Sequence, residues 1–445
     1  MSSLWESISS NGPVNGVFHG RSGSVALQEL SAGSILGEKL ESFRGRSVVL
    51  AMREQLSSAL ALLELDGVAR RLVLCTPDLT PEHLAGVLAT AEADATLDSV
   101  AAEPIPETLQ RRVTQTTEWI LLTSGTTGAP KLVVHSFESL AGALPRNSTS
   151  TKPMVWSTFY DIRRYGGLQI YLRAVLSGSP LVLSSAGEPT REFLARAGAA
   201  GVTHISGTPS HWRRALMSGD TALISPEYVR LSGEVADQTV LDNLRAAYPH
   251  ARIGHAFAST EAGVAFDVND GLAGFPQDLI RNCAGAIALK VQDGTLWIRS
   301  QRNAMRYLGG AQAPIAGDDG YVDTGDLVEL TGGRFYFRGR KGGIINVGGL
   351  KVYPEEVESV LNADPRVRMS LVKARRNPLT GSLVVAEVVL TDSESLLEAE
   401  SLDKIKSELL SACRRTLAPH KVPALLRFVP ALELSSAGKL VRPGA

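Results

Sequence analysis

The chain has 445 residues, with 45 basic and 46 acidic side chains and a formal net charge of -1. Its 44% hydrophobic and 20% charged residues are typical of a globular protein, and the balanced charge argues against a nucleic-acid or membrane-surface partner. Three widely spaced cysteines fit a reducing compartment, and the N-terminus lacks the basic and apolar regions of a signal peptide. We therefore expect a cytoplasmic protein.

Short apolar runs alternate with amphipathic stretches up to about Leu289, which predicts a doubly wound, mostly parallel sheet. Thr80 followed by Pro81 predicts that a helix begins there, because the threonine hydroxyl can cap it. Residues 1–45 are rich in Ser and Gly and only weakly patterned. We expect strands at 47–51, 71–75, 152–157, 180–184 and 202–206, and helices at 55–66, 167–176 and 191–199.

The pattern changes after Leu289 to short alternating strands with turns, which predicts a small antiparallel β subdomain. A second compact unit follows, with helices expected at 354–362 and 402–417 and strands at 369–374 and 383–390. The sequence thus predicts a large domain at residues 1–340 and a small α+β domain at residues 341–445.

A loop rich in glycine and hydroxyl groups follows the apolar run Trp119–Leu122. Its backbone N–H groups and hydroxyls can converge on one anion, and its lysine adds a positive charge, so it predicts a polyphosphate site for a nucleoside triphosphate. It is not a Walker loop, because Leu132 follows the lysine where a hydroxyl is required. A plain hairpin turn is the alternative. The loop residues are Thr123, Ser124, Gly125, Thr126, Thr127, Gly128 and Lys131.

The order Ser-Gly-Thr-Thr-Gly-x-Pro-Lys resembles the phosphate loop of the acyl-adenylate-forming enzymes, which include acyl- and aryl-CoA synthetases, nonribosomal adenylation domains and luciferases. Further matches follow in order as far as the C-terminus. The resemblance implies an α/β fold in which a large AMP-binding domain is hinged to a mobile C-terminal domain. It also implies that ATP and Mg²⁺ are used. The chain is shorter than these enzymes before residue 120.

The resemblance implies roles for further residues around the nucleotide. Each motif alone also fits a purely structural role: a plain turn at residues 232–234, a helix cap at Glu261, or a β-turn at residues 323–326. In the family, the matching positions line the adenine pocket (Ser232, Gly233 and Glu234), pack on adenine (Phe257), contact the α-phosphate (Thr260), bind Mg²⁺ (Glu261) and contact the ribose (Asp326 and Arg340).

Two further matches lie at the hinge and near the C-terminus. The hinge position, usually Asp or Lys in relatives, falls on Gly342, whose neighbour is Gly343. A double glycine offers conformational freedom but no side chain to hold one orientation. The Gly348–Gly349 loop resembles the segment that lines the pantetheine tunnel. Lys439 takes the place of the lysine that bridges the substrate carboxylate and the phosphate.

The implied reaction is attack of a carboxylate on the α-phosphate of ATP, which releases pyrophosphate and gives an acyl-adenylate. Lys439, Thr260 and Glu261 are the catalytic candidates. The small domain would then rotate, and coenzyme A would capture the acyl group as a thioester. A carrier protein, an amine or nitrite-type chemistry would use the same adenylation residues, so these acceptors stay open. A non-catalytic nucleotide-binding regulator is an alternative of another class, and it would normally lack Glu261 or Lys439.

The acid is predicted less sharply than the reaction. Aromatic residues in the run 156–160 fit either a wall of the acid pocket or ordinary core packing, and we expect a small aryl or medium-chain acyl acid. The sequence leaves open whether the protein is a monomer or a homodimer. The candidates for the acid pocket are Tyr160, Asp161, Arg163, His255 and Ala258.

Overall fold

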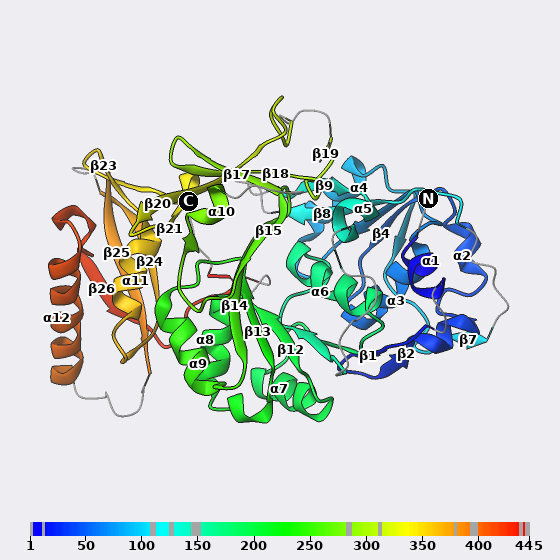
Figure 1. Ribbon diagram of the computed structural model, residues 1–445, viewed down its shortest axis with the longest axis horizontal. Helices are drawn as coiled ribbons and strands as arrows, with labels where there is room; N and C mark the ends of the chain where they lie inside the picture. Colours follow the sequence, from blue (N-terminus) through cyan, green and yellow to red (C-terminus); the bar gives the residue numbers. More distant parts are fainter. Residues whose placement is uncertain are drawn as a thin grey trace.

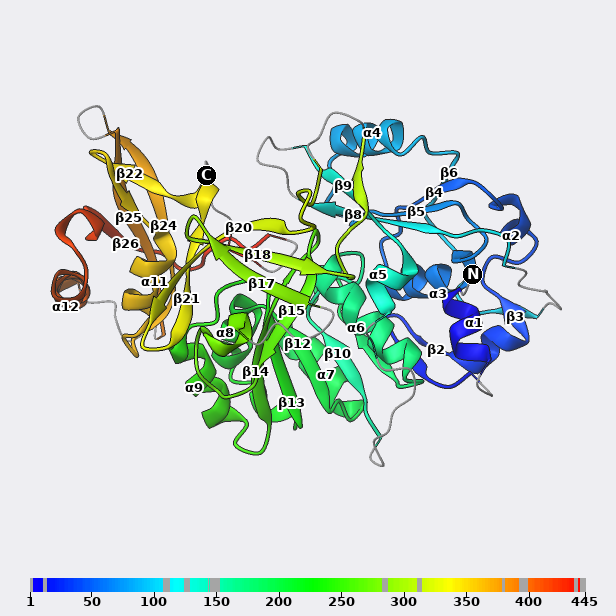
Figure 2. The ribbon, with the colours of Figure 1, turned by 45° about the horizontal axis from the view of Figure 1, so that its top comes forward.

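The computed structural model describes residues 3–10, 14–106, 113–123, 129–142, 144, 153–281, 287–309, 314–377, 381–391, 399–435 and 439–440. Figure 1 shows three parts in a row: an N-terminal sheet, a central sheet and a C-terminal unit, whose helix α12 lies at the far end. The same order is seen after a turn of the molecule in Figure 2.

The N-terminal sheet has the strand order β19-β9-β8-β5-β4-β6. Strands β6, β4, β5 and β8 run parallel, while β9 and β19 are antiparallel additions. Its central strands are buried along most of their length, as their near-continuous Val and Leu runs predict. The bounds are β4 Ser47–Leu50, β5 Arg71–Leu74, β6 Ala95–Leu97, β8 Glu118–Thr123, β9 Lys131–His135 and β19 Arg306–Leu308.

The central sheet has the order β15-β14-β13-β12-β10-β11-β1-β2. All pairs from β1 to β14 are parallel, and only the edge strands β2 and β15 are antiparallel. The expected mostly parallel architecture is therefore confirmed. The bounds are β1 Val17–His19, β2 Ser24–Ala26, β10 Trp156–Thr158, β11 Leu181–Leu183, β12 His204–Gly207, β13 Tyr228–Ser232, β14 Arg252–Ser259 and β15 Gly263–Val268.

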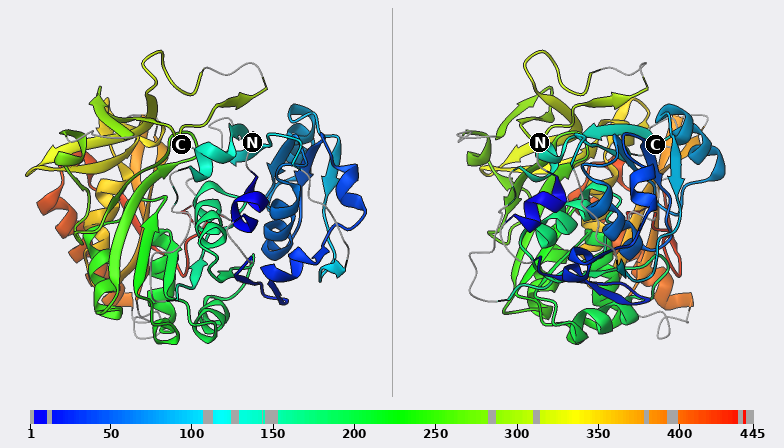
Figure 3. Two further views of the ribbon diagram at one scale, coloured as in Figure 1. Left: turned by 45° about the vertical axis from the view of Figure 1, so that its right-hand side comes forward. Right: turned by 90° about the vertical axis from the view of Figure 1, so that its right-hand side faces the viewer.

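Helices cover both sheets, and one hydrophobic cluster spans the space between them. Helices α3 and α6 contribute to that shared core. Figure 3 shows the ribbon of both sheets and their helices from two further sides. Thr80 caps α4, since its side chain accepts a hydrogen bond from the His83 amide, as expected. The bounds are α2 Lys39–Ser42, α3 Gln55–Leu65, α4 Pro81–Thr90, α5 Phe137–Ala141, α6 Tyr165–Leu176, α7 Thr190–Ala199, α8 Pro209–Ser218, α9 Gln238–Ala247 and α10 Asp278–Arg281.

The weakly patterned N-terminal section is part of the fold. β1 pairs with β11 of the central sheet, and helix α1 (Leu4–Ser9) is joined to the body through Asp66. That buried carboxylate accepts hydrogen bonds from the Leu4 amide at 2.6 Å and the Trp119 indole at 2.9 Å. Strands β3 (Gly33–Ser34) and β7 (Ile105–Pro106) form a separate two-stranded pair.

A five-stranded antiparallel sheet follows the central sheet, as the alternating pattern predicted. Beyond it, residues between Ile345 and Leu426 form a hydrophobic cluster of their own. The proposed boundary between residues 340 and 341 stays a prediction. The bounds are β16 Phe275–Pro276, β17 Ile287–Gln292, β18 Thr295–Ser300, β20 Val322–Thr331, β21 Arg334–Arg340, β22 Ile345–Val347, β23 Leu350–Val352, α11 Pro354–Asn362, β24 Val367–Asn377, β25 Gly381–Leu390, α12 Ala399–Thr416 and β26 Leu425–Phe428. Within the described parts of the chain, no helix is both long and apolar enough to cross a membrane.

Candidate active site

The C-terminal end of the chain returns from the C-terminal unit to the central sheet. We call its described residues Leu434, Ser435, Lys439 and Leu440 the lysine segment. Leu434 and Leu440 form an antiparallel bridge, and the Ser435 amide donates a 2.7 Å hydrogen bond to the Lys439 carbonyl. The Leu440 amide donates to Oε1 of Glu234 at 3.1 Å, just beyond the end of β13. Two residues matched on separate motifs, Glu234 and Lys439, therefore lie side by side.

Lys439 lies among charges from several elements. Burial lowers the pKa of Lys439, and the negative charge of Glu234 opposes that shift. The pKa of Lys439 is also lowered by the positive charges of Arg340 and Arg164 and raised by the negative charge of Asp326. The Lys439 residue as a whole is nevertheless exposed to solvent. Arg164, at the start of α6, was not singled out from the sequence.

Asp326 and Arg340 face each other across the β20–β21 pair. Arg340 Nε donates to Oδ1 of Asp326 at 3.0 Å, and its Nη2 donates to the Thr324 carbonyl at 3.3 Å. Burial raises the pKa of Asp326 even though the positive charge of Arg340 opposes the shift. The carboxylate is thus held in a fixed place beside the lysine segment.

Lys131 and Glu261 are brought together by Tyr307. Lys131 begins β9, which pairs with β19, and its Nζ lies 5.2 Å from the centre of the Tyr307 ring. The Tyr307 hydroxyl lies 3.5 Å from Oε1 of Glu261. Burial, and next the Glu261 charge, raises the pKa of Tyr307 to about 12. We did not identify Tyr307 from the sequence, because a single aromatic residue in a short strand carries no motif.

The Thr260–Glu261 turn is held by His135 at the end of β9. Its Nε2 lies 2.8 Å from the Thr260 carbonyl, and its Nδ1 lies 3.0 Å from the Ser139 hydroxyl. Burial lowers the pKa of His135 to about 4, so the ring is neutral near pH 7, with Nε2–H as donor. Glu261 lies in the β14–β15 connection and not at a helix cap.

The phosphate loop joins two antiparallel strands. Thr123 at the end of β8 pairs with Lys131 at the start of β9. The intervening Ser124, Gly125, Thr126, Thr127 and Gly128 lie outside the described residues. The strand that precedes the loop and the position of its lysine follow the sequence prediction.

Two of the acid-pocket candidates form an internal ion pair. The Arg163 guanidinium contacts both carboxylate oxygens of Asp161, at 2.7 and 2.6 Å, and also donates to the Met52 carbonyl. Arg163 is 1% exposed. These contacts favour a structural role for Asp161 and Arg163, because both have protein partners on their charged groups.

The β14 candidates point to opposite faces of the central sheet, because side chains alternate along a strand. Ala258 packs against the core shared with α6. Phe257 instead stacks on Phe337, with ring centres 5.1 Å apart, on the side of the antiparallel sheet. His255 is buried and bonds the Leu272 carbonyl at 3.0 Å. Ala258 and His255 therefore do not line one pocket, and His255 is a poor candidate for contact with the acid.

Tyr160 does lie beside the nucleotide motifs. Its hydroxyl donates to the Ser232 carbonyl at 2.7 Å, where β13 ends. Burial raises the pKa of Tyr160, so its hydroxyl stays protonated and can donate. Gly233 follows with a φ of +86°, a conformation that favours glycine. This contact joins the Tyr160 loop to the turn that carries Glu234.

A cluster of arginines lies on the α6 side of the central sheet, and we did not predict it. Arg230 of β13 is 7% exposed and contacts Asp267 at 2.7 Å. Burial lowers the pKa of Arg173 in α6, and the positive charges of Arg230 and Arg302 lower it further. The negative charge of Asp267 opposes this shift. The charges of Arg230, Arg302 and Asp267 therefore all act on Arg173. Among the residues that the structure describes, none forms a hydrogen bond or ion pair with the guanidinium group of Arg173.

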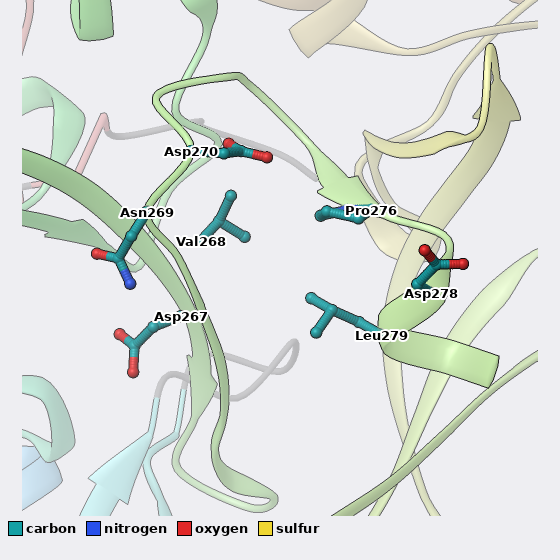
Figure 4. A pocket seen from close by; sticks show the side chains of 7 residues that line it. All are labelled: Asp267, Val268, Asn269, Asp270, Pro276, Asp278 and Leu279. Atoms are coloured by element: carbon teal, nitrogen blue, oxygen red, sulfur yellow. The ribbon is translucent and has the colours of Figure 1, made fainter. Parts of the chain in front are cut away.

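A cavity of about 330 Å³ lies between the end of β15 and α10 (Figure 4), and Asp267, the partner of Arg230, is one of its lining residues. Two of its aspartates are already paired, Asp267 with Arg230 and Asp270 with Arg334. None of the nucleotide motif residues lines it. This cavity is therefore not the candidate active site.

Gly342 lies in the short helical turn Lys341–Gly343, between β21 and β22. Its φ is outside the left-handed region, and an added Cβ would meet nothing within 4 Å. Larger residues would therefore fit this conformation. Its hinge role stays a prediction. If position 342 requires a glycine, that requirement belongs to another orientation of the two domains.

Comparisons with known proteins identify the family of the chain. A family described as AMP-binding enzyme matches residues 44–308, and the C-terminal domain of AMP-binding enzymes matches residues 356–439. The chain belongs to the AMP-binding enzyme family. The family spans both the large domain and the lysine segment, as the resemblance implied.

Two relatives in the family are 2-succinylbenzoate–CoA ligases. The one from Geobacillus kaustophilus (strain HTA426) is 27% identical over 428 residues, covering 88% of this chain and 81% of the relative. The one from Bacillus velezensis (strain DSM 23117 / BGSC 10A6 / LMG 26770 / FZB42) is 26% identical over 415 residues, covering 89% and 82%.

Solved structures share the fold. The o-succinylbenzoate CoA synthetase MenE from Bacillus subtilis, in complex with the acyl-adenylate intermediate OSB-AMP, has a TM-score of 0.76 at 19% identity, covering 100% of this chain and 98% of that one. The anthranilate CoA ligase AuaEII in complex with anthranoyl-AMP has a TM-score of 0.79 at 16% identity, covering 99% and 95%. The predicted acyl-adenylate-forming fold is therefore confirmed.

Proposed function

We propose that this protein uses ATP to activate a carboxylic acid as its acyl-adenylate, releases pyrophosphate, and transfers the acyl group to coenzyme A. The observation that carries the proposal is the placement of Lys439. The lysine segment brings its ammonium group to the edge of the large domain, among Glu234, Asp326 and Arg340. A regulator that only binds nucleotide has no need for this lysine.

The first step requires two anions, a carboxylate and a polyphosphate, to approach each other. Lys439 would neutralise the charge where they meet, which lowers the barrier most where the charge develops. Lys131 would hold the phosphates that leave, since it begins the strand after the phosphate loop. Asp326 would accept hydrogen bonds from the ribose, because a carboxylate offers two acceptor oxygens to a diol.

Mg²⁺ fits the residues around the phosphate loop. Mg²⁺ in ATP sites is commonly held by one or two carboxylates, together with phosphate oxygens and water. Glu261 offers one carboxylate close to Lys131 and Tyr307. Among the described residues, no group of three or more potential metal ligands is present, which fits a site completed by phosphates. When bound, Mg²⁺ would supply positive charge to the reacting phosphates.

The arginine cluster indicates which acid is activated. Three guanidinium groups near one carboxylate leave an excess of positive charge in a largely buried place, which favours an anionic ligand. We therefore propose an aryl acid with a second carboxylate. The relatives named 2-succinylbenzoate–CoA ligases act on an acid whose name describes two carboxyl groups.

The experiment is an acid panel in an ATP–pyrophosphate exchange assay. 2-Succinylbenzoate and other aryl dicarboxylates should support exchange far better than benzoate or medium-chain monocarboxylates. Product analysis by mass spectrometry with coenzyme A, a holo carrier protein or an amine then identifies the acceptor. Exchange that no acid stimulates would contradict the proposed function. Exchange with monocarboxylates alone would contradict the assigned class of acid.

A further inference from the structure

We propose that Glu234 is a positioning residue that holds the lysine segment on the large domain for the first half-reaction. This inference rests on the proposed function. It gives Glu234 a role distinct from lining the adenine pocket, the role that the sequence resemblance implied. The two carboxylate oxygens of Glu234 have different partners.

One oxygen is fixed by the N-terminus of α8. The first residue of that helix, Pro209, has no N–H, and the His211 amide is capped by the Thr208 hydroxyl at 3.0 Å. The Ser210 amide donates to Oε2 of Glu234 at 2.9 Å. A carboxylate at this position satisfies a helix-terminal amide and is favoured by the helix dipole. The side chain is therefore held on a rigid element.

The other oxygen receives the lysine segment. The Leu440 amide, immediately after Lys439, donates to Oε1 of Glu234 at 3.1 Å. The negative charge of Glu234 also attracts the Lys439 ammonium group. Gly233 makes the approach possible, since an added Cβ would lie only 3.3 Å from Cε of Lys439. Both carboxylate oxygens thus bind protein amides, and one of these amides belongs to the lysine segment.

Helix α8 also contacts the C-terminal unit near its other end. Arg368 of β24 donates from Nη2 to the Met217 carbonyl at 3.4 Å, near the C-terminus of α8. A cation at the C-terminus of a helix complements the carboxylate at its N-terminus. Helix α8 therefore contacts the C-terminal unit directly near its C-terminus, and through Glu234 at its N-terminus. Glu234 makes the contact that lies next to the reacting lysine.

The test is Glu234→Gln, with Glu192→Gln as a matched control. Glu192 is a surface residue, 53% exposed, whose ion pair with Arg21 lies away from the lysine segment. Glu234→Gln should lower kcat for pyrophosphate exchange by about tenfold, the effect of weakening a hydrogen bond to a charged group. The KM for ATP and the rate of coenzyme A capture of a supplied acyl-adenylate should be unchanged. The control variant should match the wild type in all three.

A second readout does not depend on activity. Hydrogen exchange, followed by mass spectrometry on the peptide that contains residues 434–440, should be faster in Glu234→Gln than in Glu192→Gln. A raised KM for ATP with normal kcat would overturn the proposal in favour of an adenine contact. Unchanged kinetics, unchanged exchange of the peptide or equal loss of both half-reactions would also overturn it. If the wild type adenylates no acid, the proposed function fails, and the peptide measurement still decides whether Glu234 holds the segment.

Discussion

The C-terminal unit carries two regions with motif residues, and their surroundings differ. The lysine segment contacts Glu234 and lies among charged groups of the large domain. The hairpin of β22 and β23 turns at Gly348 and Gly349, both with positive φ, and an added Cβ at either would meet nothing within 4 Å. Leu350, beside the turn, is 52% exposed. Figure 2 shows β22 at the outer side of this unit.

This difference indicates which half-reaction the observed arrangement serves. The lysine segment contacts the large domain, whereas the turn of the hairpin is exposed and an added Cβ there meets no other residue. We infer that the structure has the arrangement that serves adenylation. We assign the hairpin to the later thioester step. Variants of the two regions should therefore affect different half-reactions.

The largest effect is expected from Lys439→Ala. It removes the positive charge at the meeting point of the two anions, so acid-dependent pyrophosphate exchange should fall by about 10²–10³-fold. Initial rates at saturating ATP and acid would measure this loss. A decrease that higher substrate concentrations restore would instead assign Lys439 to ground-state binding.

Arg173→Gln tests a site that belongs to the large domain alone. Loss of a hydrogen bond to a charged group should raise the KM for the acid by roughly one to two orders of magnitude. The KM for ATP should stay constant, because the arginine cluster lies on the α6 side of the central sheet. Arg21→Gln is a control, as its ion pair with Glu192 is at the surface. Equal changes in the KM for the acid and the KM for ATP would show that Arg173 does not bind the acid.

The sequence predicted those parts of the site that are local motifs. Each of the residues Lys131, Glu261, Asp326, Arg340 and Lys439 belongs to a recognisable run. In the structure Lys131 and Glu261 meet at Tyr307, and Asp326, Arg340 and Lys439 form a second group, on which the charge of Glu261 acts through Arg340. The contacts that join them are long-range and carry no local pattern: Tyr307 reaches the site through the pairing of β19 with β9. The arginine cluster was missed for the same reason, since its members come from α6, β13 and the segment after β18.

The elements that the sequence predicted well are those in which the period of the hydrophobic residues and the helix-capping residues agree. Helix α11 has the expected bounds, and Thr80 caps α4 as its hydroxyl and the following proline indicated. The N-terminal section gave no such signal, because its strands are two or three residues long and depend on distant partners. β1, for example, is specified by pairing with β11.

The pH dependence of the two half-reactions should also differ. Burial lowers the pKa of Lys439, so the protonated form that adenylation requires is lost at a lower pH than for an ordinary lysine. Exchange should therefore fall as pH rises through this pKa, while capture by coenzyme A should rise as its thiol ionises. Rate profiles from neutral to alkaline pH would measure both. Any exchange retained by Lys439→Arg should lack the alkaline decrease.

The smallest effect is expected from the hairpin. Gly348→Ala and Gly349→Ala place a Cβ at positive φ, at a local cost of about 1 kcal/mol. Exchange should be unchanged, because the hairpin is remote from the lysine segment, while capture by coenzyme A should slow. Stopped-flow mixing with a preformed acyl-adenylate separates the two steps. Slower exchange in these variants would contradict the assignment of the hairpin to the second step.

The lysine segment and the hairpin are assigned to different half-reactions. The most direct test of this assignment is the rate at which Lys439→Ala transfers a supplied acyl-adenylate to coenzyme A. If the lysine segment serves adenylation alone, the variant should form the thioester at a rate close to that of the wild type, although it makes adenylate far more slowly. A loss of thioester formation as large as its loss of pyrophosphate exchange would contradict the account.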